Sequence, residues 1–534
     1  MKIRQFLALA LIGLVLGSCR KPDAGDGPDG VEPEGKMVKT KLSIAIPKSI
    51  RTYAPGDGDA YATEEEKKAN TIDVFIYENG GSYALTYYHF KPNDPAGPTT
   101  GTVADGEFGL NNPEATHFVT ADFDVRQGPK LVYVGINLPT FIVNRLRTGY
   151  FVNEIFQQTD LINELVTGAL ATGSGELAFF NTEIVEHEVD ADDEDIAVSV
   201  SRLVAKMIVM AQDGDDDITA GNDASWDVNG GTVSSLEFAI GQRNNQMFVS
   251  PLVSNADPNY VNDSIPNVGA TSTPGNIRKL QAVDINDYLV VNDIGASTTS
   301  SATHIRYATE NTSANYRHRD VTYVSIRAKF IPHRLGGDPA TGKIPDDGST
   351  YNTDEIAGGF YAVFTGDPEG DDGIGVRYFA ANDLEGARNF VMGAYFRALA
   401  PDLTDRVVGD FVANAEDKYS DHYIHFYANS HCYYRIYLNP AGNYNILRNT
   451  VYLATITGVN YIGTTDPDHL PGSIVYSNGK GTPTYPGAWF PNNLPHLPVT
   501  DGDQIDPLDS MTGLSVRIEL TPWDDVEDDD VVVY

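Results

Sequence analysis

The chain has 534 residues, and its 37 Lys and Arg against 74 Asp and Glu give a formal net charge of −37. This balance excludes a nucleic-acid binder, because contact with phosphates needs a basic face. Hydrophobic residues make up 41% of the chain, enough for packed cores, which excludes wholesale disorder. The 50 Gly, 30 Pro and 29 Tyr favour short strands joined by loops.

The first residues have the pattern of an export signal. Two basic residues precede an apolar run over 6–16, which is too short to span a bilayer as a stable helix. The run ends in Leu-Gly-Ser before Cys19, which is similar to the lipobox of bacterial lipoproteins. We therefore expect a signal peptide over 1–19 and a lipid such as palmitate on Cys19. Residues 20–36 are rich in Pro, Gly and Asp and are expected to form a disordered tether.

A half-buried strand is predicted directly after the tether. Apolar residues and Thr40 alternate with polar residues from Val38 to Ile46, and Pro47 ends the pattern. Arg51 then opens a Gly-, Asp- and Glu-rich loop, where a trypsin-like protease could cut between Arg51 and Thr52. Such a cut would release residues 1–51 and leave an open sheet edge, which invites a strand from another chain.

The remaining body is expected to be mostly β, with a few short helices and long loops. Helical spacing of apolar residues predicts a helix over Phe151–Val166, and a weaker helix is expected over Leu384–Leu399. Strands are predicted at Ile72–Tyr77, Lys130–Ile136, Val198–Met210, Ser235–Ile240, Val321–Ile331, Phe360–Thr365, Cys432–Leu438 and Thr450–Thr457. The pattern favours two β-sandwich domains, over 52–196 and 197–513, with the boundary placed after the acidic run Asp190–Asp195.

No catalytic motif is present. The sequence has no nucleophile elbow, phosphate-binding loop or zinc-protease helix, and Cys432 lies in a strand-like stretch that favours a buried, structural thiol. The spacing of His422, His425 and His431 does not suit a metal site, since the first two would point to opposite faces of a strand. The acidic runs lack the full calcium-loop pattern, which leaves calcium open. We expect no enzyme activity, no cofactor and no metal.

The end of the chain repeats the pattern of its first strand. A Pro-rich stretch over 464–510 is followed by Leu514, Val516, Ile518 and Leu520 on one face of a strand, with polar residues between them. This segment, 514–534, could donate a strand to the open edge of a neighbouring chain. The alternative is that the strand belongs to its own C-terminal sandwich. The donor could also be the acidic tail over Val526–Tyr534.

Several segments resemble the FimA/Mfa-like fimbrillins, the type V pilus subunits of Bacteroidia. The likeness follows the whole chain in order and is closest to the Mfa-type shaft subunits, although the loops between the segments do not align. It is carried by the lipobox and by KTKLSIAIPKSIR (39–51), SRLVAKMIV (201–209), TYVSIRAKFIP (322–332), YLNPAGNYNILRNTVYLATITGV (437–459) and LSVRIELTPW (514–523). The RNTVY piece and the closing V-x-I-x-L-x-P-W are the most characteristic.

The resemblance implies a fold of two tandem transthyretin-like β-sandwiches. It also implies an outer-membrane lipoprotein precursor that is cleaved after Arg51 and polymerises by exchange of a C-terminal donor strand into an extracellular fimbrium. Its partners would be further copies of itself, anchor and tip subunits, a trypsin-like maturation protease, and host or bacterial surface glycans or proteins. Contact with a membrane would be made only through the lipid of the precursor. The alternative is a tip or anchor adhesin, or a glycan-binding surface lipoprotein.

Overall fold

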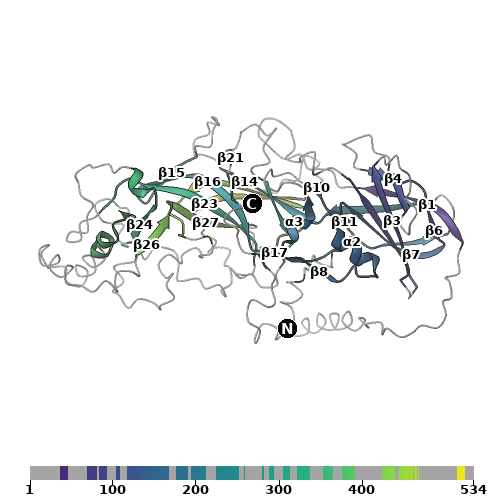
Figure 1. The fold of residues 1–534 in the computed structure, drawn as a ribbon. Coiled ribbons are helices and arrows are strands. Elements are labelled where there is room, and N and C mark those ends of the chain that lie inside the picture. The colour runs from purple at the N-terminus through teal and green to yellow at the C-terminus, as the bar shows by residue number, and fades with distance from the viewer. Residues whose placement is uncertain are drawn as a thin grey trace, which may run out of the picture.

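The computed structural model describes residues 36–45, 66, 69–80, 83–92, 104–108, 117–167, 176–190, 194–211, 224–251, 258, 280–281, 288–290, 292–293, 305–312, 321–336, 353–364, 376–390, 424–438, 444–460, 462–465, 467 and 514–522. In this part of the chain strands predominate. The strands of the N-terminal part gather at one end of an elongated molecule and those of the C-terminal part at the other (Figure 1).

The N-terminal part is built around one ten-stranded sheet, with strand order β4-β3-β2-β7-β11-β13-β1-β5; β12 also pairs with β7, and β6 with β1. Residues from both ends of this path, such as Phe90 and Ile44, belong to one hydrophobic cluster, so the sheet folds over on itself as a sandwich. The elements are β1 (Met37–Ala45), β2 (Ile72–Glu78), β3 (Leu85–Pro92), β4 (Ala104–Phe108), β5 (His117–Val119), β6 (Phe123–Arg126), β7 (Gly128–Ile136), α2 (Thr140–Arg147), β8 (Ile155–Gln157), α3 (Leu161–Leu165), β9 (Val166–Thr167), β10 (Glu176–Leu177), β11 (Phe179–Asn181), β12 (Val185–Val189) and β13 (Glu194–Arg202).

The C-terminal part contains two five-stranded sheets that share a second hydrophobic cluster. One has the order β21-β14-β28-β29, with β22 also on β14, and the other has the order β15-β16-β23-β27, with β20 also on β16. A three-stranded sheet, β25-β24-β26, lies beside them at the far end (Figure 1). The elements are β14 (Val204–Ala211), β15 (Trp226–Val228), β16 (Gly231–Gly241), β17 (Arg243–Asn244), β18 (Gln246–Phe248), β19 (Leu280–Gln281), β20 (Leu289–Val290), β21 (Asn292–Asp293), β22 (Ile305–Thr309), β23 (Tyr323–Pro332), η5 (Thr353–Ile356), β24 (Gly359–Phe364), β25 (Val376–Ala380), β26 (Ile424–Ala428), β27 (His431–Tyr437), β28 (Thr450–Val459) and β29 (Leu514–Pro522).

The chain changes from the first sheet to the second between β13 and β14. The sequence predicts one strand over Val198–Met210. The structure divides it at Leu203, which belongs to neither β13 nor β14. Every residue of β14 is buried, because Ile208 faces the N-terminal cluster while Met207 faces the C-terminal one. The domain boundary expected at 196/197 falls inside β13, and the strands change sheet at Leu203.

The helix expected over Phe151–Val166 is wrong for most of its length. The structure has β8, which pairs with β18, and only the single turn of α3 from Leu161. Ile155, Phe156 and Gln157 pair with Phe248, Met247 and Gln246, and this long-range ladder overrides the local helical spacing. Residues 384–390 are helical, and the rest of the weaker helix expected there lies outside the described residues.

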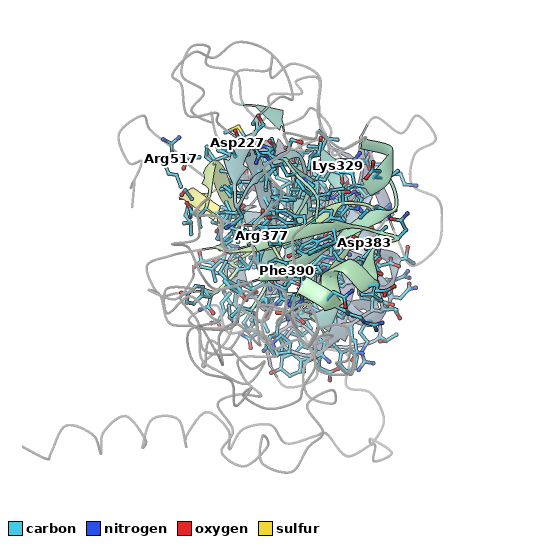
Figure 2. The ribbon with its side chains drawn as sticks, turned by 90° about the vertical axis from the view of Figure 1, so that its left-hand side faces the viewer. Asp227, Lys329, Arg377, Asp383, Phe390 and Arg517 are labelled. Carbon is cyan, nitrogen blue, oxygen red and sulfur yellow. The ribbon has the colours of Figure 1, made fainter. Side chains whose placement is uncertain are left out.

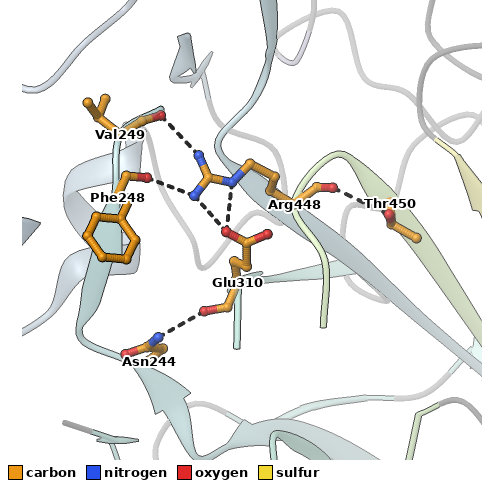
Figure 3. A network of polar contacts seen from close by, with 6 residues as sticks. All are labelled: Asn244, Phe248, Val249, Glu310, Arg448 and Thr450. Carbon is orange, nitrogen blue, oxygen red and sulfur yellow. Dashed lines mark hydrogen bonds and ion pairs between the residues drawn. The ribbon is translucent and has the colours of Figure 1, made fainter. Parts of the chain in front are cut away.

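A buried polar network holds the start of β28 against β18 and β22 (Figure 3). Arg448 donates from Nε (2.9 Å) and Nη2 (2.6 Å) to Oε2 of Glu310. It also donates to the carbonyl oxygens of Phe248 (2.8 Å) and Val249 (3.0 Å). Arg448 and Glu310 are both buried, so each charge depends on the other to offset the cost of leaving water. Arg448, the arginine of the RNTVY segment, therefore anchors the start of β28, the strand that pairs with β29.

Candidate strand-exchange site

β1 lies inside the N-terminal sheet, between two other sets of strands. On one side it runs parallel to β13, with Thr40 opposite Glu194 and Ala45 opposite Ser199. On its other side it runs antiparallel to β6 near its start and to β5 near its end. The main chain of Leu42 also exchanges hydrogen bonds with Thr120, from its N–H to Oγ1 (2.9 Å) and from the Thr120 N–H to its carbonyl (3.0 Å).

The inner face of β1 belongs to the hydrophobic core. Val38 is 2% exposed, Leu42 and Ile44 are 0% exposed, and all three belong to the N-terminal cluster. The alternation predicted for Val38, Thr40, Leu42 and Ile44 is therefore confirmed, while Ile46 lies outside the described residues. Burying three aliphatic side chains of this size contributes about 1.5–3 kcal/mol each.

The outer face of β1 contributes little to its retention. Met37, Lys39 and Ala45 are exposed, and the ion pair from Lys41 to Asp195 spans 3.4 Å between partly exposed side chains. Exposed pairs of this kind are worth about 0–1 kcal/mol. The inner face and the two ladders therefore hold β1 in place.

Removing β1 would open a slot rather than a single edge. Within the described residues, the strand pairings of β5 and β6 are made with β1. A chain without β1 would therefore present unpaired main-chain groups of β13 on one side and of β5 and β6 on the other. The floor between them would be the apolar surface that Val38, Leu42 and Ile44 cover. Such a slot has room for one strand with an alternating apolar face.

The residues predicted to be lipidated or cleaved are not among the described residues. Cys19, Arg51 and Thr52 are all outside the described residues, as is the acidic tail over 523–534. The end of β1 nonetheless has a defined place, because β1 is parallel to β13. Ala45 lies opposite Ser199, three residues before β13 ends at Arg202, so the chain leaves β1 toward the junction with the C-terminal sheets.

Among the described residues, β29 is the edge strand of the C-terminal sheet β21-β14-β28-β29. It pairs antiparallel with β28 along its whole length, from Leu514 opposite Val459 to Pro522 opposite Thr450. Leu514 is 8% and Ile518 6% exposed. Val516 and Leu520 are partly buried against the same cluster, so the four residues predicted to share a face do share it.

The outward face of β29 is polar. Arg517 is exposed, and its side chain projects away from the sheet in the end-on view of Figure 2. In the described state β29 is therefore not a free strand, because it completes the sheet of its own chain. The structure does not bring β29 and β1 together, since they lie in separate sheets.

The described residues hold no arrangement that suggests catalysis or metal binding. Among them no group of three or more His, Cys, Asp or Glu side chains could hold a metal ion. Burial raises the pKa of the Cys432 thiol to about 11, which keeps it protonated and unreactive near neutral pH. His425 is buried on β26 and His431 lies on β27, while His422 lies outside the described residues. No helix in the described part of the chain is long and apolar enough to cross a membrane.

Sequence reasoning missed a buried ionic cluster that includes Glu66, which follows Arg51 by 15 residues in the sequence. Lys206 on β14 and Glu66, in the segment before β2, form an ion pair of 2.9 Å with side chains that are 2% and 0% exposed. Tyr307, opposite Lys206 on β22, donates its hydroxyl to the other carboxylate oxygen of Glu66. A glutamate within an exposed-looking acidic run gives no signal of burial, and only the lysine within the apolar stretch SRLVAKMIV indicated a buried charge.

Comparison with known proteins finds solved structures of low similarity. No protein-family model and no curated protein matches the sequence. A candidate cell adhesion protein from Parabacteroides distasonis is similar at a TM-score of 0.37 and 12% identity, covering 91% of this chain and 100% of that chain. The FimA fimbrilin from Porphyromonas gingivalis has a TM-score of 0.34 at 12% identity, covering 80% of this chain and 92% of its own. The tip fimbrial protein Mfa3 from Porphyromonas gingivalis, with a C-terminal truncation, has a TM-score of 0.33 at 8% identity, covering 79% and 96%.

Proposed function

We propose that this protein is the shaft subunit of a cell-surface fimbrium, made as a lipoprotein on Cys19 and matured by a cut between Arg51 and Thr52. The observation that carries the proposal is the place of β1. β1 is paired on both sides, and Arg51 follows six residues after the strand ends, in the segment that leads to the rest of the chain. Loss of residues 1–51 would therefore convert a closed sheet into an acceptor slot.

The donor in this proposal is β29, through Leu514, Val516, Ile518 and Leu520. Its apolar face has the same period as that of β1, and its place at a sheet edge means that one ladder, with β28, must break for it to leave. In the slot it would gain partners on both sides, β13 and β5 with β6. The exchange is therefore favourable if the second ladder and the burial of the apolar face outweigh the loss of the contacts with β28.

Polymerisation after cleavage tests the maturation step. The precursor is treated with an arginine-specific protease, which does not cut after Lys48, and examined for filaments by electron microscopy. Arg51→Gln should stay monomeric, because β1 remains in its slot, whereas the matched variant Lys48→Gln keeps Arg51 and should polymerise like the wild type. Filaments of Arg51→Gln that still contain residues 37–45 would overturn the proposal.

Synthetic peptides test the donor without altering the protein. An excess of the peptide 514–523 should fill the slot of cleaved subunits and stop elongation, and the same peptide with Asp at positions 516 and 518 should have no effect. A peptide covering 526–534 tests the tail as the donor. Inhibition by the tail peptide alone would assign donation to the tail rather than to β29, and inhibition by neither would argue against strand exchange.

A further inference from the structure

The slot proposed for the donor strand has an acidic border on its outward face. Lys41 of β1 lies opposite Asp195 of β13, and Lys39 lies opposite Asp124 of β6. The Nζ of Lys41 is 3.4 Å from Oδ1 of Asp195, and both aspartates are exposed. Loss of residues 1–51 would remove the two lysines and leave the two aspartates at the rim of the slot.

The two aspartates have different neighbours along their own strands. Arg126 follows Asp124 by two residues on β6, where it lies opposite Met37, so a basic residue remains beside Asp124 after β1 has gone. The corresponding neighbour of Asp195 on β13 is Ala197, which carries no charge. Among these strand neighbours, Asp195 therefore depends more than Asp124 on the positive charge that β1 supplies.

The donor strand carries one positive charge, on its outward face. Arg517 is the only Lys or Arg in the segment 514–523. It is exposed, and its side chain points away from the sheet in Figure 2. The outward face of β29 therefore offers the same kind of charge as the lysines that leave with β1.

The apolar residues of the donor determine where Arg517 would lie in the slot. The inward positions of β1 are 38, 40, 42 and 44, all buried, and the donor has four apolar residues at the same spacing, 514, 516, 518 and 520. When these four fill the inward positions, Arg517 takes the place of Lys41, opposite Asp195. The result is the same for a donor running in either direction, because 517 is the midpoint of 514–520 and 41 is the midpoint of 38–44.

We infer that Asp195 binds Arg517 of the next copy and fixes the register of the donor strand. The inference rests on the proposed exchange of β29. A slip by one residue turns the apolar face outward, and a slip by two leaves one apolar residue outside the slot and moves Arg517 opposite Ala197 or Asp124. A surface ion pair adds little to the strength of the finished contact, so its effect is on the rate and specificity of docking.

Competition between peptides tests this pairing without altering the donor in the protein. Cleaved subunits elongate filaments in the presence of the peptide 514–523 or of the same peptide carrying Arg517→Glu, and light scattering gives the concentration of each that halves the rate. On wild-type subunits the peptide with Arg517→Glu should require a concentration about threefold to tenfold higher, because an attraction between exposed charges becomes a repulsion. The ratio of the two concentrations should approach one at about 1 M salt, where such charges are screened.

Asp195→Lys is the decisive variant, and it adds no site for an arginine-specific protease. It should reverse the preference, so that the peptide with Arg517→Glu becomes the stronger inhibitor. Asp195→Asn should bring the ratio close to one and serves if Asp195→Lys does not fold. Asp227→Lys is the matched control, because Asp227 is also exposed but lies on β15, in a different sheet (Figure 2). It changes the net charge equally and should keep the wild-type ratio.

Three results would overturn the inference: equal inhibition of wild-type subunits by the two peptides, an unchanged ratio in both Asp195→Lys and Asp195→Asn, or a reversed ratio in Asp227→Lys. In each of these cases inhibition by both peptides would still support β29 as the donor. If neither peptide slowed the elongation of wild-type subunits, the proposed exchange itself would be refuted, and the pairing of Arg517 with Asp195 would fall with it.

Discussion

Replacing Leu42 by Ala should destabilise the precursor but not the mature protein. Leu42 is 0% exposed within the N-terminal cluster, and truncating a fully buried leucine costs about 2–5 kcal/mol of unfolding free energy. After cleavage at Arg51 and loss of residues 1–51, the variant and the wild type have the same sequence. Their free energies of unfolding should then coincide.

Urea denaturation followed by intrinsic fluorescence measures this difference in the precursor and in the cleaved, repurified subunit. Ile72→Ala is the matched control, because Ile72 is also 0% exposed in the same cluster but lies on β2, which remains after cleavage. It should lower stability at both stages. If Leu42→Ala lowered the stability of the cleaved protein as much as that of the precursor, the released strand would still occupy the sheet and no slot would exist.

Three further outcomes follow from the C-terminal sheets. Arg448→Met should lower the free energy of unfolding by about 3–5 kcal/mol, since it leaves the buried Glu310 without its guanidinium, and the double variant with Glu310→Gln should recover part of the loss in urea titrations. Because burial raises the pKa of Cys432 from 9.0 to about 11, the stability that depends on its neutral thiol is present below pH 9 and is lost as the pH rises toward 11. The thiol should react with a disulfide reagent only upon unfolding; fast labelling of the native protein would contradict its burial. Arg517→Glu should change the free energy of unfolding by no more than about 0.5 kcal/mol, because Arg517 is exposed. Ile518→Asp places a charge at a buried position and should unfold the edge of the sheet. Equal effects of the two variants in thermal melts would contradict the assignment of the two faces.

The sequence predicted the alternating strands well because their period is local. The inward residues of β1 and β29 follow from alternation alone, since side chains on a strand point to opposite faces in turn. Mainly apolar runs also identified β2 and β7, in which the residues over 72–77 and 130–136 are buried on both faces. Alternation does not indicate to which sheet a strand belongs. For β29 the sequence therefore could not distinguish a strand paired within its own chain from a free donor strand.

Long-range contacts explain what the sequence did not predict. The helix expected over Phe151–Val166 failed because β8 finds its partner in β18, about ninety residues away, where a cross-strand ladder outweighs local spacing. The burial of Glu66 depends on Lys206, 140 residues later, and so left no local mark. Arg448 stood out only through the resemblance of its motif, although its physical role is to bind Glu310 and two carbonyl groups.

The central claim is that the first strand is absent from the assembled protein. The direct measurement is the N-terminal sequence of subunits in filaments sheared from the cell surface, together with a peptide map of the same material. Our account predicts an N-terminus at Thr52, no peptides from residues 1–51, and full recovery of Leu514–Pro522. Subunits that begin at Cys19 and still contain Met37–Ala45 would contradict it.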